Sequence, residues 1–249
     1  MPAREPKTIW DDERLADPHG QPDKAARVEA MFDTIAPTYE RVNRLLSAGR
    51  DAYWRSQAVT LAETRTSDRI LDVACGTGDF ARAFAEVRPE ATIGCDFSEP
   101  MLRLAVRRTG PAVAWCRADA LALPFPGDSF SLVSCAFGVR NFQNLHSGLV
   151  EMHRVLIPAG RAVILEFSVP RSRFLGGLYL LYFRRILPRL ATLISRDRSG
   201  AYRYLPSSVS SFADEREMAA ALRAAGFQRV QHWSLTIGAA TVFVAWKRG

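Results

Sequence analysis

The sequence has few cysteines, very few lysines and no long apolar run. Its four cysteines lie about twenty residues apart, which fits neither a zinc site nor a compact disulfide framework, so we interpret them as reduced thiols. No window approaches the roughly 18 uninterrupted apolar residues of a transmembrane helix. The polar segment 1–24 lacks the apolar stretch of a secretory signal, and we therefore expect a cytoplasmic protein.

The net charge of +7 comes almost wholly from arginine, since only Lys7, Lys24 and Lys247 are lysines. An excess of this sign is typical of proteins that contact nucleic acid or an anionic membrane surface. The range 171–203 holds eight arginines and one acid, Asp197, around a strongly apolar stretch. We find no nucleic-acid module and no platform of aromatic and basic side chains for stacking bases, so we expect no nucleic-acid partner.

Strands and helices alternate from residue 69 onward. The short apolar segments that we predict as strands are 69–74, 91–95, 113–116, 131–136 and 161–167. The segments between them that we predict as helices are 80–86, 99–108 and 145–156. This alternation predicts an α/β fold with a parallel, doubly wound sheet. A helix at 215–225 and two strands at 230–235 and 241–246 end the chain, and the two strands should form an antiparallel hairpin.

Three segments lie outside this alternation. Residues 1–24 are predicted to form a flexible N-terminal arm. Helical periodicity then predicts a cap over residues 25–64. Residues 171–210 interrupt the alternation and are predicted to form an inserted helical lid. We therefore expect a single domain over residues 25–249.

The most informative local motif is Asp72-Val-Ala-Cys-Gly-Thr-Gly-Asp79, between the first predicted strand and the first predicted helix. The small residues Ala74, Gly76 and Gly78 let the backbone turn sharply and approach a ligand closely. Asp96 ends the second predicted strand, and a carboxylate there can accept both hydroxyls of a ribose. The motif therefore indicates an adenosine-containing cofactor.

Two cofactor classes fit this loop, and a tight turn without a ligand is a third interpretation. Gly76-x-Gly78-x-x-Ala81, with an acid about twenty residues on, also fits the relaxed dinucleotide fingerprint. However, a pyrophosphate favours a helix N-terminus free of acids, whereas Asp79 lies in the first helical turn. A sulfonium cofactor with an ammonium group suits Asp72 and Asp79. We therefore favour S-adenosylmethionine over NAD.

A second segment supports this choice. Asp119-Ala120 follows the third predicted strand and precedes Leu-Ala-Leu-Pro-Phe. It resembles the methyltransferase segment whose acid meets the adenine amino group. The whole pattern resembles the class I S-adenosylmethionine methyltransferase fold, which is Rossmann-like. This resemblance implies a seven-stranded, mostly parallel sheet with a C-terminal antiparallel hairpin.

From Lys24 onward, nearly the whole chain resembles one family, and four further segments carry this resemblance. They are Met31-Phe-Asp-Thr-Ile-Ala-Pro-Thr-Tyr39 with Asn43, Leu46-Ser47 and Trp54; Ala136-Phe-Gly-Val-Arg-Asn141; Arg154 to Gly160 with Leu165-Glu-Phe-Ser168; and Tyr202-Arg-Tyr-Leu205 with Ser208-Val209 and Phe212. The chain resembles the quinone-biosynthesis C-methyltransferases, which include the demethylmenaquinone and 2-polyprenyl-6-methoxy-benzoquinol methyltransferases. The residues that depart from the family pattern are Glu40, Val42, Asp51 (usually His), Ala136 (Ser in some members), Ile157 and Ala159.

The resemblance implies methylation of a ring carbon of a polyprenyl quinol, and it favours demethylmenaquinol as the substrate. A benzoquinol precursor of ubiquinone and another small aromatic metabolite are the alternatives. Two other classes of protein are also considered. An RNA methyltransferase would explain the positive net charge, and a non-catalytic regulator would be expected to lack the glycine loop or Arg140-Asn141.

Because the quinol is lipid-bound, we expect transient contact with the inner face of the cytoplasmic membrane through the apolar run 174–183. Arg171, Arg173, Arg184 and Arg185 flank this run, with a buried lid as the alternative. A homodimer is left open.

We expect the residues that perform this methylation to lie at the carboxyl ends of the predicted strands, where ligands bind in such sheets. Loss of a phenolic proton makes the quinol ring electron-rich, and no metal is required. Arg140 and Asn141 follow the fourth predicted strand, and Arg140 is our candidate for stabilising the phenolate, with a structural anchor as the alternative. Glu166 ends the fifth predicted strand and is our candidate acid for a base role. Tyr202 and Tyr204 are candidates for the quinol pocket, with plain packing as the alternative.

The candidate cofactor-binding residues are carried over from the loop, the strand ends and the family segments. They are Tyr39, Asp72, Ala74, Gly76, Thr77, Gly78, Asp96, Phe97, Asp119, Ala120 and Ala136. For Tyr39, an ordinary core aromatic is the alternative. We expect no metal site, because the sequence holds no cluster of metal-ligating residues.

Overall fold

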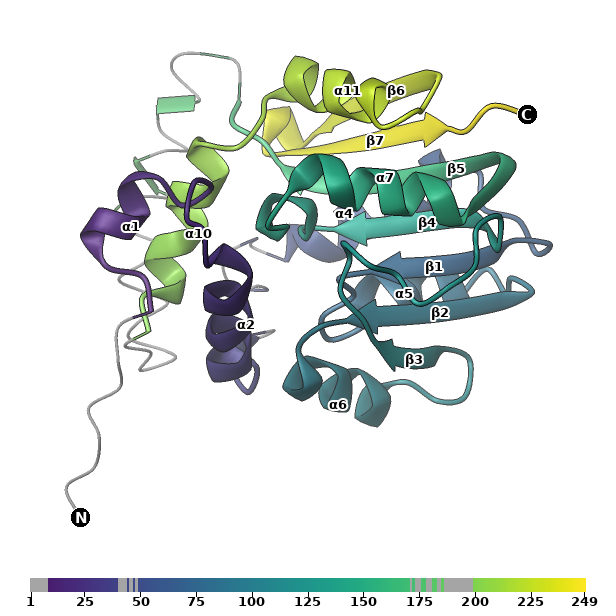
Figure 1. Ribbon diagram of the computed structural model, residues 1–249, viewed down its shortest axis with the longest axis horizontal. Helices are drawn as coiled ribbons and strands as arrows, with labels where there is room; N and C mark the ends of the chain where they lie inside the picture. The colour runs from purple at the N-terminus through teal and green to yellow at the C-terminus, as the bar shows by residue number, and fades with distance from the viewer. Residues whose placement is uncertain are drawn as a thin grey trace.

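The computed structural model describes residues 9–39, 44, 47, 49–170, 172, 176–177, 181–182, 185 and 199–249. A seven-stranded sheet runs through this part of the chain in the order β3-β2-β1-β4-β5-β7-β6 (Figure 1). The strands are β1 (Arg69–Val73), β2 (Ala91–Asp96), β3 (Ala114–Arg117), β4 (Phe130–Ala136), β5 (Leu156–Phe167), β6 (Arg229–Leu235) and β7 (Ala240–Trp246). Strands β1 to β5 are parallel, and β7 is antiparallel to both of its neighbours. The predicted fold class is confirmed.

Helices cover both faces of the sheet (Figure 1). The helices are α1 (Asp12–Ala16), α2 (Lys24–Ile35), α4 (Arg50–Leu61), α5 (Asp79–Ala85), α6 (Glu99–Arg108), α7 (Leu145–Val155), α10 (Ala201–Ser210) and α11 (Glu215–Ala224), with short 3₁₀ turns η1 (Val139–Asn141) and η3 (Thr236–Gly238). Side chains of α7 and α11 pack on one face and side chains of α4 and α5 on the other. Because successive strand residues point to opposite faces, Ile70 packs under α4 and α5 whereas Leu71 packs under α7 and α11.

One strand boundary differs from the prediction. The sequence predicts the fifth strand over 161–167, whereas β5 begins at Leu156. Ala159 adopts a positive φ of 60°, and the register between β4 and β5 shifts between Phe130 and Leu132. The Pro-Ala-Gly sequence therefore forms an irregularity inside a long strand, because the backbone pairs with β4 on either side of it.

Residues 9–24, within the segment predicted as a flexible arm, pack against the rest of the described chain. Trp10 is fully buried, and its ring stacks on Tyr204 with 4.3 Å between the ring centroids. The amides of Ile9 and Trp10 donate to the carbonyl of Ser199 at 2.9 and 3.1 Å. One large aromatic side chain buries enough area to dock a segment that shows no periodicity of its own. Residues 1–8 lie outside the described residues.

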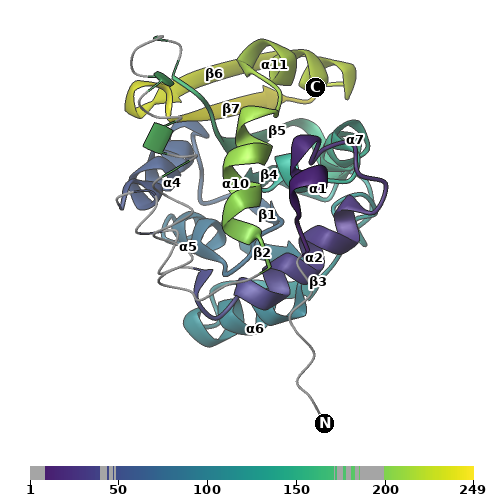
Figure 2. The same cartoon turned by 90° about the vertical axis from the view of Figure 1, so that its left-hand side faces the viewer.

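Helices α1, α2 and α10 gather beyond the carboxyl ends of the parallel strands, and Figure 2 looks onto this end of the molecule. Lys24, at the start of α2, donates from Nζ to the carbonyl of Phe142 at 2.7 Å. This bond ties the N-terminal cap to the segment after β4. Most of the predicted lid lies outside the described residues, and α10 is its largest described part. Among the described residues, no helix is long and apolar enough to cross a membrane.

Candidate active site

Two strained turns open a crevice at the middle of the sheet. Ala74 follows β1 with a φ of 53°, and Phe137 follows β4 with a φ of 57°. Strands β1 and β4 are neighbours, but α5 and α7, which follow them, pack on opposite faces. Ligands bind at such switch points in open α/β sheets, and non-glycine residues with positive φ gather at functional sites.

A cavity of about 510 Å³ lies at this crevice, a size typical of small-molecule sites. The predicted site residues that line it are Tyr39, Ala74, Gly76, Asp96, Phe97, Asp119, Ala120, Ala136 and Asn141. They come from the cap, from the ends of β1, β2 and β4 and from the segment after β3. The sheet thus brings together residues that are up to a hundred positions apart in the sequence.

Asp96 is held in place by two backbone amides. Its Oδ2 accepts from Gly76 N and its Oδ1 from Ser98 N, both at 2.8 Å. Burial raises the pKa of Asp96 to about 6, so the carboxylate is mainly ionised at neutral pH. Gly76 has a φ of 54°, and a Cβ placed on it would meet no atom within 4 Å. The loop therefore presents bare backbone beside the oriented carboxylate.

Three predicted cofactor residues do not line the cavity. Asp72 is fully buried and its Oδ1 accepts from Ser134 Oγ at 2.7 Å, because the strand register places Ser134 of β4 directly beside it. Burial raises the pKa of Asp72 to about 7. Thr77 is buried, and Gly78 lies against Trp115, whose ring a Cβ at Gly78 would approach to 2.3 Å. These three residues therefore contact the protein interior and support the loop on the side away from the cavity.

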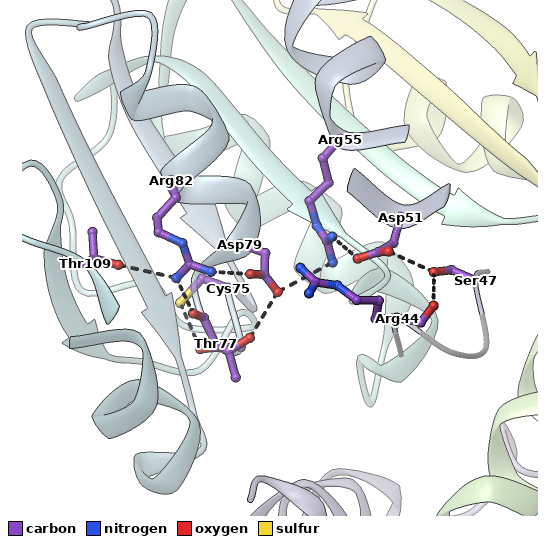
Figure 3. Close-up of polar contacts among 10 residues, drawn as sticks. Arg44, Ser47, Asp51, Arg55, Cys75, Thr77, Asp79, Arg82 and Thr109 are labelled. Carbon is purple, nitrogen blue, oxygen red and sulfur yellow. Dashed lines mark hydrogen bonds and ion pairs between the residues drawn. The ribbon is translucent and has the colours of Figure 1, made fainter. Parts of the chain in front are cut away.

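Asp79, expected to face a sulfonium group, is engaged by two arginines instead (Figure 3). Arg82 forms an ion pair with its Oδ1, and Arg55 approaches its Oδ2 at 3.8 Å. Thr77 donates from Oγ1 to the same Oδ2 at 3.2 Å. The charge of Asp79 is therefore neutralised within the protein, and the acid serves to join the glycine loop to α4.

A second, narrower cavity adjoins the first. The residues that line both cavities are Phe32, Tyr39 and Phe137. The remaining polar residues of the second cavity are Ser47, Asp51, Arg55, Arg140, Tyr202 and Tyr204. Its aromatic walls include Phe137 and Phe167, whose rings stack at 4.3 Å. The structure thus places the predicted quinol residues Tyr202 and Tyr204 in one cavity with Arg140.

Arg140 is buried at the wall of this second cavity. Its Nη1 donates to Glu166 Oε1 at 2.7 Å and to the carbonyl of Phe137 at 2.6 Å. Its Nε has no hydrogen-bond partner among the described residues. Arg140 therefore retains a buried, charged donor that its protein partners leave unused.

Glu166 does not face either of these cavities. Its Oε1 accepts from Arg140 and from the amide of Phe167, and its side chain borders a separate cavity beside Thr241. Burial raises the pKa of Glu166 although Arg140 opposes this effect. The prediction that Glu166 supplies the base is not supported by this geometry, because the carboxylate is committed to orienting Arg140.

Asn141 connects the segment after β4 to α10. Its Oδ1 accepts from Tyr204 Oη at 3.0 Å, and its Nδ2 donates to the carbonyl of Phe137 at 3.3 Å. Burial raises the pKa of Tyr204, so its hydroxyl remains a donor at neutral pH. Because Asn141 also lines the first cavity, it lies where the two cavities meet.

Several lining residues were missed from the sequence. In the first cavity, Arg117 ends β3 and pairs with Glu29 on α2 at 2.9 Å. In the second, Asp51 and Arg55 come from α4. The terminal position of Arg117 on a strand was a usable signal. Asp51 stood out in the sequence only as a departure from the family pattern, and nothing placed it or Arg55 at a cavity, because their place depends on how the helix packs.

Solved structures of low sequence identity share this fold. A SAM-dependent methyltransferase from Thermotoga maritima has a TM-score of 0.63 and 20% identity, over 88% of this chain and 99% of that chain. An S-adenosylmethionine-dependent methyltransferase from Mesorhizobium loti has a TM-score of 0.54 and 19% identity, over 77% and 96%. The chain thus has the fold of the S-adenosylmethionine-dependent methyltransferases.

The family follows from the sequence comparison. The model of the ubiE/COQ5 methyltransferase family matches residues 21–247, and the chain belongs to this family. A demethylmenaquinone methyltransferase from Thermus thermophilus is 48% identical over 86% of this chain and 98% of its own length. A ubiquinone/menaquinone biosynthesis C-methyltransferase UbiE from Geobacter sulfurreducens is 44% identical over 90% of each. The chain is an enzyme of this family, with S-adenosylmethionine as its cofactor.

The first cavity fits this cofactor. Asp96 and Asp119 offer carboxylate acceptors for ribose hydroxyls and an adenine amino group, and the bare backbone of Gly76 permits close approach. Asp119 is oriented by the amide of Leu121, which donates to its Oδ1 at 2.9 Å. Phe97 provides an apolar wall. Among the described residues, no group of side chains could hold a metal ion.

Proposed function

We propose that this enzyme methylates a ring carbon of a polyprenyl quinol and converts demethylmenaquinol to menaquinol. The observation that carries the proposal is the aromatic cavity that adjoins the cofactor cavity and is lined by Arg140, whose buried Nε has no hydrogen-bond partner among the described residues. Relatives from Deinococcus radiodurans and Thermus thermophilus are named demethylmenaquinone methyltransferases, which favours the naphthoquinol. The relative from Geobacter sulfurreducens, named for ubiquinone and menaquinone biosynthesis, supports a benzoquinol as the second candidate.

In this proposal the residues of the first cavity hold the cofactor. Asp96 accepts the ribose hydroxyls, Asp119 accepts the adenine amino group, and Gly76 lets the backbone approach the ligand. Tyr39 lies between the two cavities and covers the cofactor. When bound, S-adenosylmethionine supplies an electrophilic methyl group. The further cofactor contacts that we propose are Ala74, Phe97, Ala120 and Ala136.

The residues of the second cavity act on the quinol ring. Arg140 donates to the developing phenolate oxygen, in a buried place where a charged donor counts for more than in water. Its guanidinium stays protonated and is not a base. Asn141 and Glu166 hold Arg140 and its loop in place, and Phe137 and Phe167 exclude water from the ring. Fixed proximity of ring and methyl group supplies much of the remaining acceleration.

The test is anaerobic methyl transfer to demethylmenaquinol and, in parallel, to its oxidised quinone. We expect turnover of the quinol alone, because the quinone has no hydroxyl to ionise and its ring is electron-poor. Ratios of kcat/KM for naphthoquinol and benzoquinol substrates decide between the two candidates. Equal turnover of quinone and quinol would contradict the mechanism, and no turnover of either quinol would contradict the proposed function.

We further propose that the enzyme contacts the membrane surface reversibly while it collects its substrate. Of the arginines flanking 174–183, only Arg185 belongs to the described residues, so most of the predicted contact lies outside them. The described support is Ile237, which is 75% exposed in η3 with a φ of 58°. Trp54 Nε1 donates to Thr236 Oγ1 at 2.7 Å, which joins η3 to α4, where Tyr53 is 45% exposed. Exposed apolar side chains therefore border the edge of the sheet that carries the site.

Replacing Ile237 with Asp should weaken sedimentation with anionic liposomes and slow turnover of long-tailed quinols. The acid is repelled by an anionic surface and removes an apolar side chain that can insert into it. A matched control is Val106→Asp. Val106 is 54% exposed on α6, which packs near β3, the edge strand farthest from β6 and β7. Turnover of a short-tailed analogue should not change in either variant. Liposome binding by the Ile237 variant equal to that of the parent would exclude η3 from the contact.

A further inference from the structure

The described geometry leaves the acceptor of the phenolic proton unassigned. Arg140 stays protonated, Glu166 is turned away from the second cavity, and burial raises the pKa of Tyr204. The titratable and charged residues that line the second cavity within the described part of the chain are Tyr39, Asp51, Arg55, Arg140, Tyr202 and Tyr204. Asp51 is the carboxylate among them.

Two hydrogen bonds fix the Asp51 carboxylate at the cavity wall (Figure 3). Ser47 donates from Oγ to Asp51 Oδ1 at 2.8 Å, and Arg55 donates from Nη1 to Oδ2 at 2.6 Å. Each oxygen retains a second lone pair, and the side chain is 18% exposed. The carboxylate is thus oriented, partly accessible and still able to accept a hydrogen bond from a ligand.

Arg55 anchors Asp51 relative to the cofactor loop (Figure 3). Its guanidinium lies 5.7 Å from the ring centroid of Phe137 and bridges from Asp51 to Asp79. Asp79 in turn is bonded to Thr77, which lies in the glycine loop. A continuous row of polar contacts therefore runs from the loop beside the cofactor cavity to the carboxylate in the second cavity.

We propose that Asp51 is the catalytic residue that accepts the hydroxyl proton of the quinol. The proposal rests on the proposed function and assigns the base within the same site. It differs from the role first predicted for Glu166, because Asp51 lines the cavity that contains Arg140 whereas Glu166 does not.

The proton of the ring hydroxyl passes to Asp51, and the electron pair of that O–H bond stays on the oxygen, from which density moves onto the ring carbon. The carbon forms a bond to the methyl group while the bond from methyl to the donor sulfur breaks, leaving its pair on sulfur. The ring carbon then loses its hydrogen to water as a proton, and Asp51 returns its proton to the oxygen. One proton is released for each methyl group transferred.

Asp51 is in the deprotonated state that a proton acceptor needs. Burial by itself raises the pKa of Asp51, but the hydrogen bonds from Arg55 and Ser47 outweigh burial and hold this pKa below its usual value. An acid with a lowered pKa is ionised at every pH above that value, so the base is ready throughout the neutral range. The charged and titratable groups that face it from other elements are Tyr39, Arg140, Tyr202 and Tyr204, with Asp79 reached through Arg55.

The test is Asp51→Asn in the full chain, assayed anaerobically with demethylmenaquinol. We expect kcat to fall on the order of 10²-fold or more, the usual contribution of a positioned base, and cofactor affinity by calorimetry to stay as in the parent. Between about pH 6 and about pH 9 the parent's kcat should be flat, because Asp51 is already ionised. In the variant, log kcat should rise by about one for each pH unit, because the proton must pass to hydroxide.

A matched control is Asp23→Asn. Asp23 also pairs with an arginine four residues on, Arg27, at 2.7 Å, but it lies outside both cavities. The control should keep the parent's kcat and its flat profile. Formate added to Asp51→Ala should restore turnover in proportion to its binding, because a free carboxylate can occupy the vacated space, and it should have no effect on Asp23→Asn.

The outcomes separate the two proposals. If the parent fails to methylate any quinol, the proposed function is wrong. If the parent is active and Asp51→Asn keeps kcat within about threefold and a flat profile, the inference is wrong. Should Asp51→Asn fail to fold, Ser47→Ala decides. Losing one hydrogen bond to the ionised form raises the pKa of Asp51, so the acid limb of the profile should move to higher pH. An acid limb that does not move would overturn the assignment.

Discussion

Replacing Arg140 with Ala should lower kcat by roughly 10²-fold or more while leaving the affinity for S-adenosylmethionine nearly intact. The guanidinium lines the second cavity but not the cofactor cavity, and its Nε is an unused charged donor within the described residues. It should therefore act on charge that develops in the transition state. Anaerobic steady-state kinetics with the quinol, together with calorimetry for the cofactor, measure the two effects separately.

The same substitution should also destabilise the fold, since it leaves Glu166 buried without its cation. Breaking one side of a buried ion pair costs about 3–5 kcal/mol, and both side chains here are less than a tenth exposed. Adding Glu166→Gln to the variant removes the unpaired charge and should recover part of the thermal stability without recovering kcat. Arg103→Ala, an exposed arginine on α6 paired with Glu99, is the control for kcat. An unchanged kcat in the folded Arg140 variant would exclude this residue from the chemistry.

Replacing Asp96 with Ala should weaken binding of S-adenosylmethionine by roughly 1–3 kcal/mol, which is about 5- to 150-fold in Kd. The substitution removes the proposed acceptor of the ribose hydroxyls and leaves the amides of Gly76 and Ser98 without their partner. Calorimetry measures the loss directly. The parent should not bind NADH, and binding of NADH without binding of S-adenosylmethionine would contradict the assignment of the cavity.

The pH dependence of this affinity follows from the same carboxylate. Burial raises the pKa of Asp96 to about 6, and only the ionised form accepts from both ribose hydroxyls. The affinity of the parent should therefore be constant above about pH 6 and fall as the pH drops below that value. In Asp96→Ala this acid-side loss should be absent. A parent affinity that stays level down to about pH 5 would show that Asp96 is not titrating in the site.

The features that the sequence predicted well all depend on short-range patterns. Continuous apolar runs predict strands that are buried on both faces, and β1 and β4 have that character. The glycine loop follows β1 and Asp96 is the last residue of β2, as expected, because parallel strands bring their carboxyl ends to one edge. Short-range sequence patterns were therefore enough to predict the architecture and the position of the cofactor cavity.

The orientation of single acids within the site was harder to predict. Asp72 and Asp96 both end or nearly end a strand, yet only Asp96 lines the cavity. The register pairs Asp72 with Gly94 on β2, so Asp72 lies two positions deeper in the sheet than Asp96, and Ser134 beside it on β4 donates to its Oδ1. In the same way Glu166 belongs to the last residues of β5 but turns to Arg140 and away from both cavities.

By itself, the sequence determined the fold, the glycine loop and the family, because periodicity, turn residues and ordered motifs are properties of neighbouring residues. Only the tertiary structure decided which side chains share a cavity. Asp51 lines one cavity with Arg140 because α4 packs on the sheet beside η3, and Trp10 docks the N-terminal segment by stacking on Tyr204, far along the chain. Such contacts depend on the summed packing of distant elements, and the free energy of that packing is not encoded in any one segment.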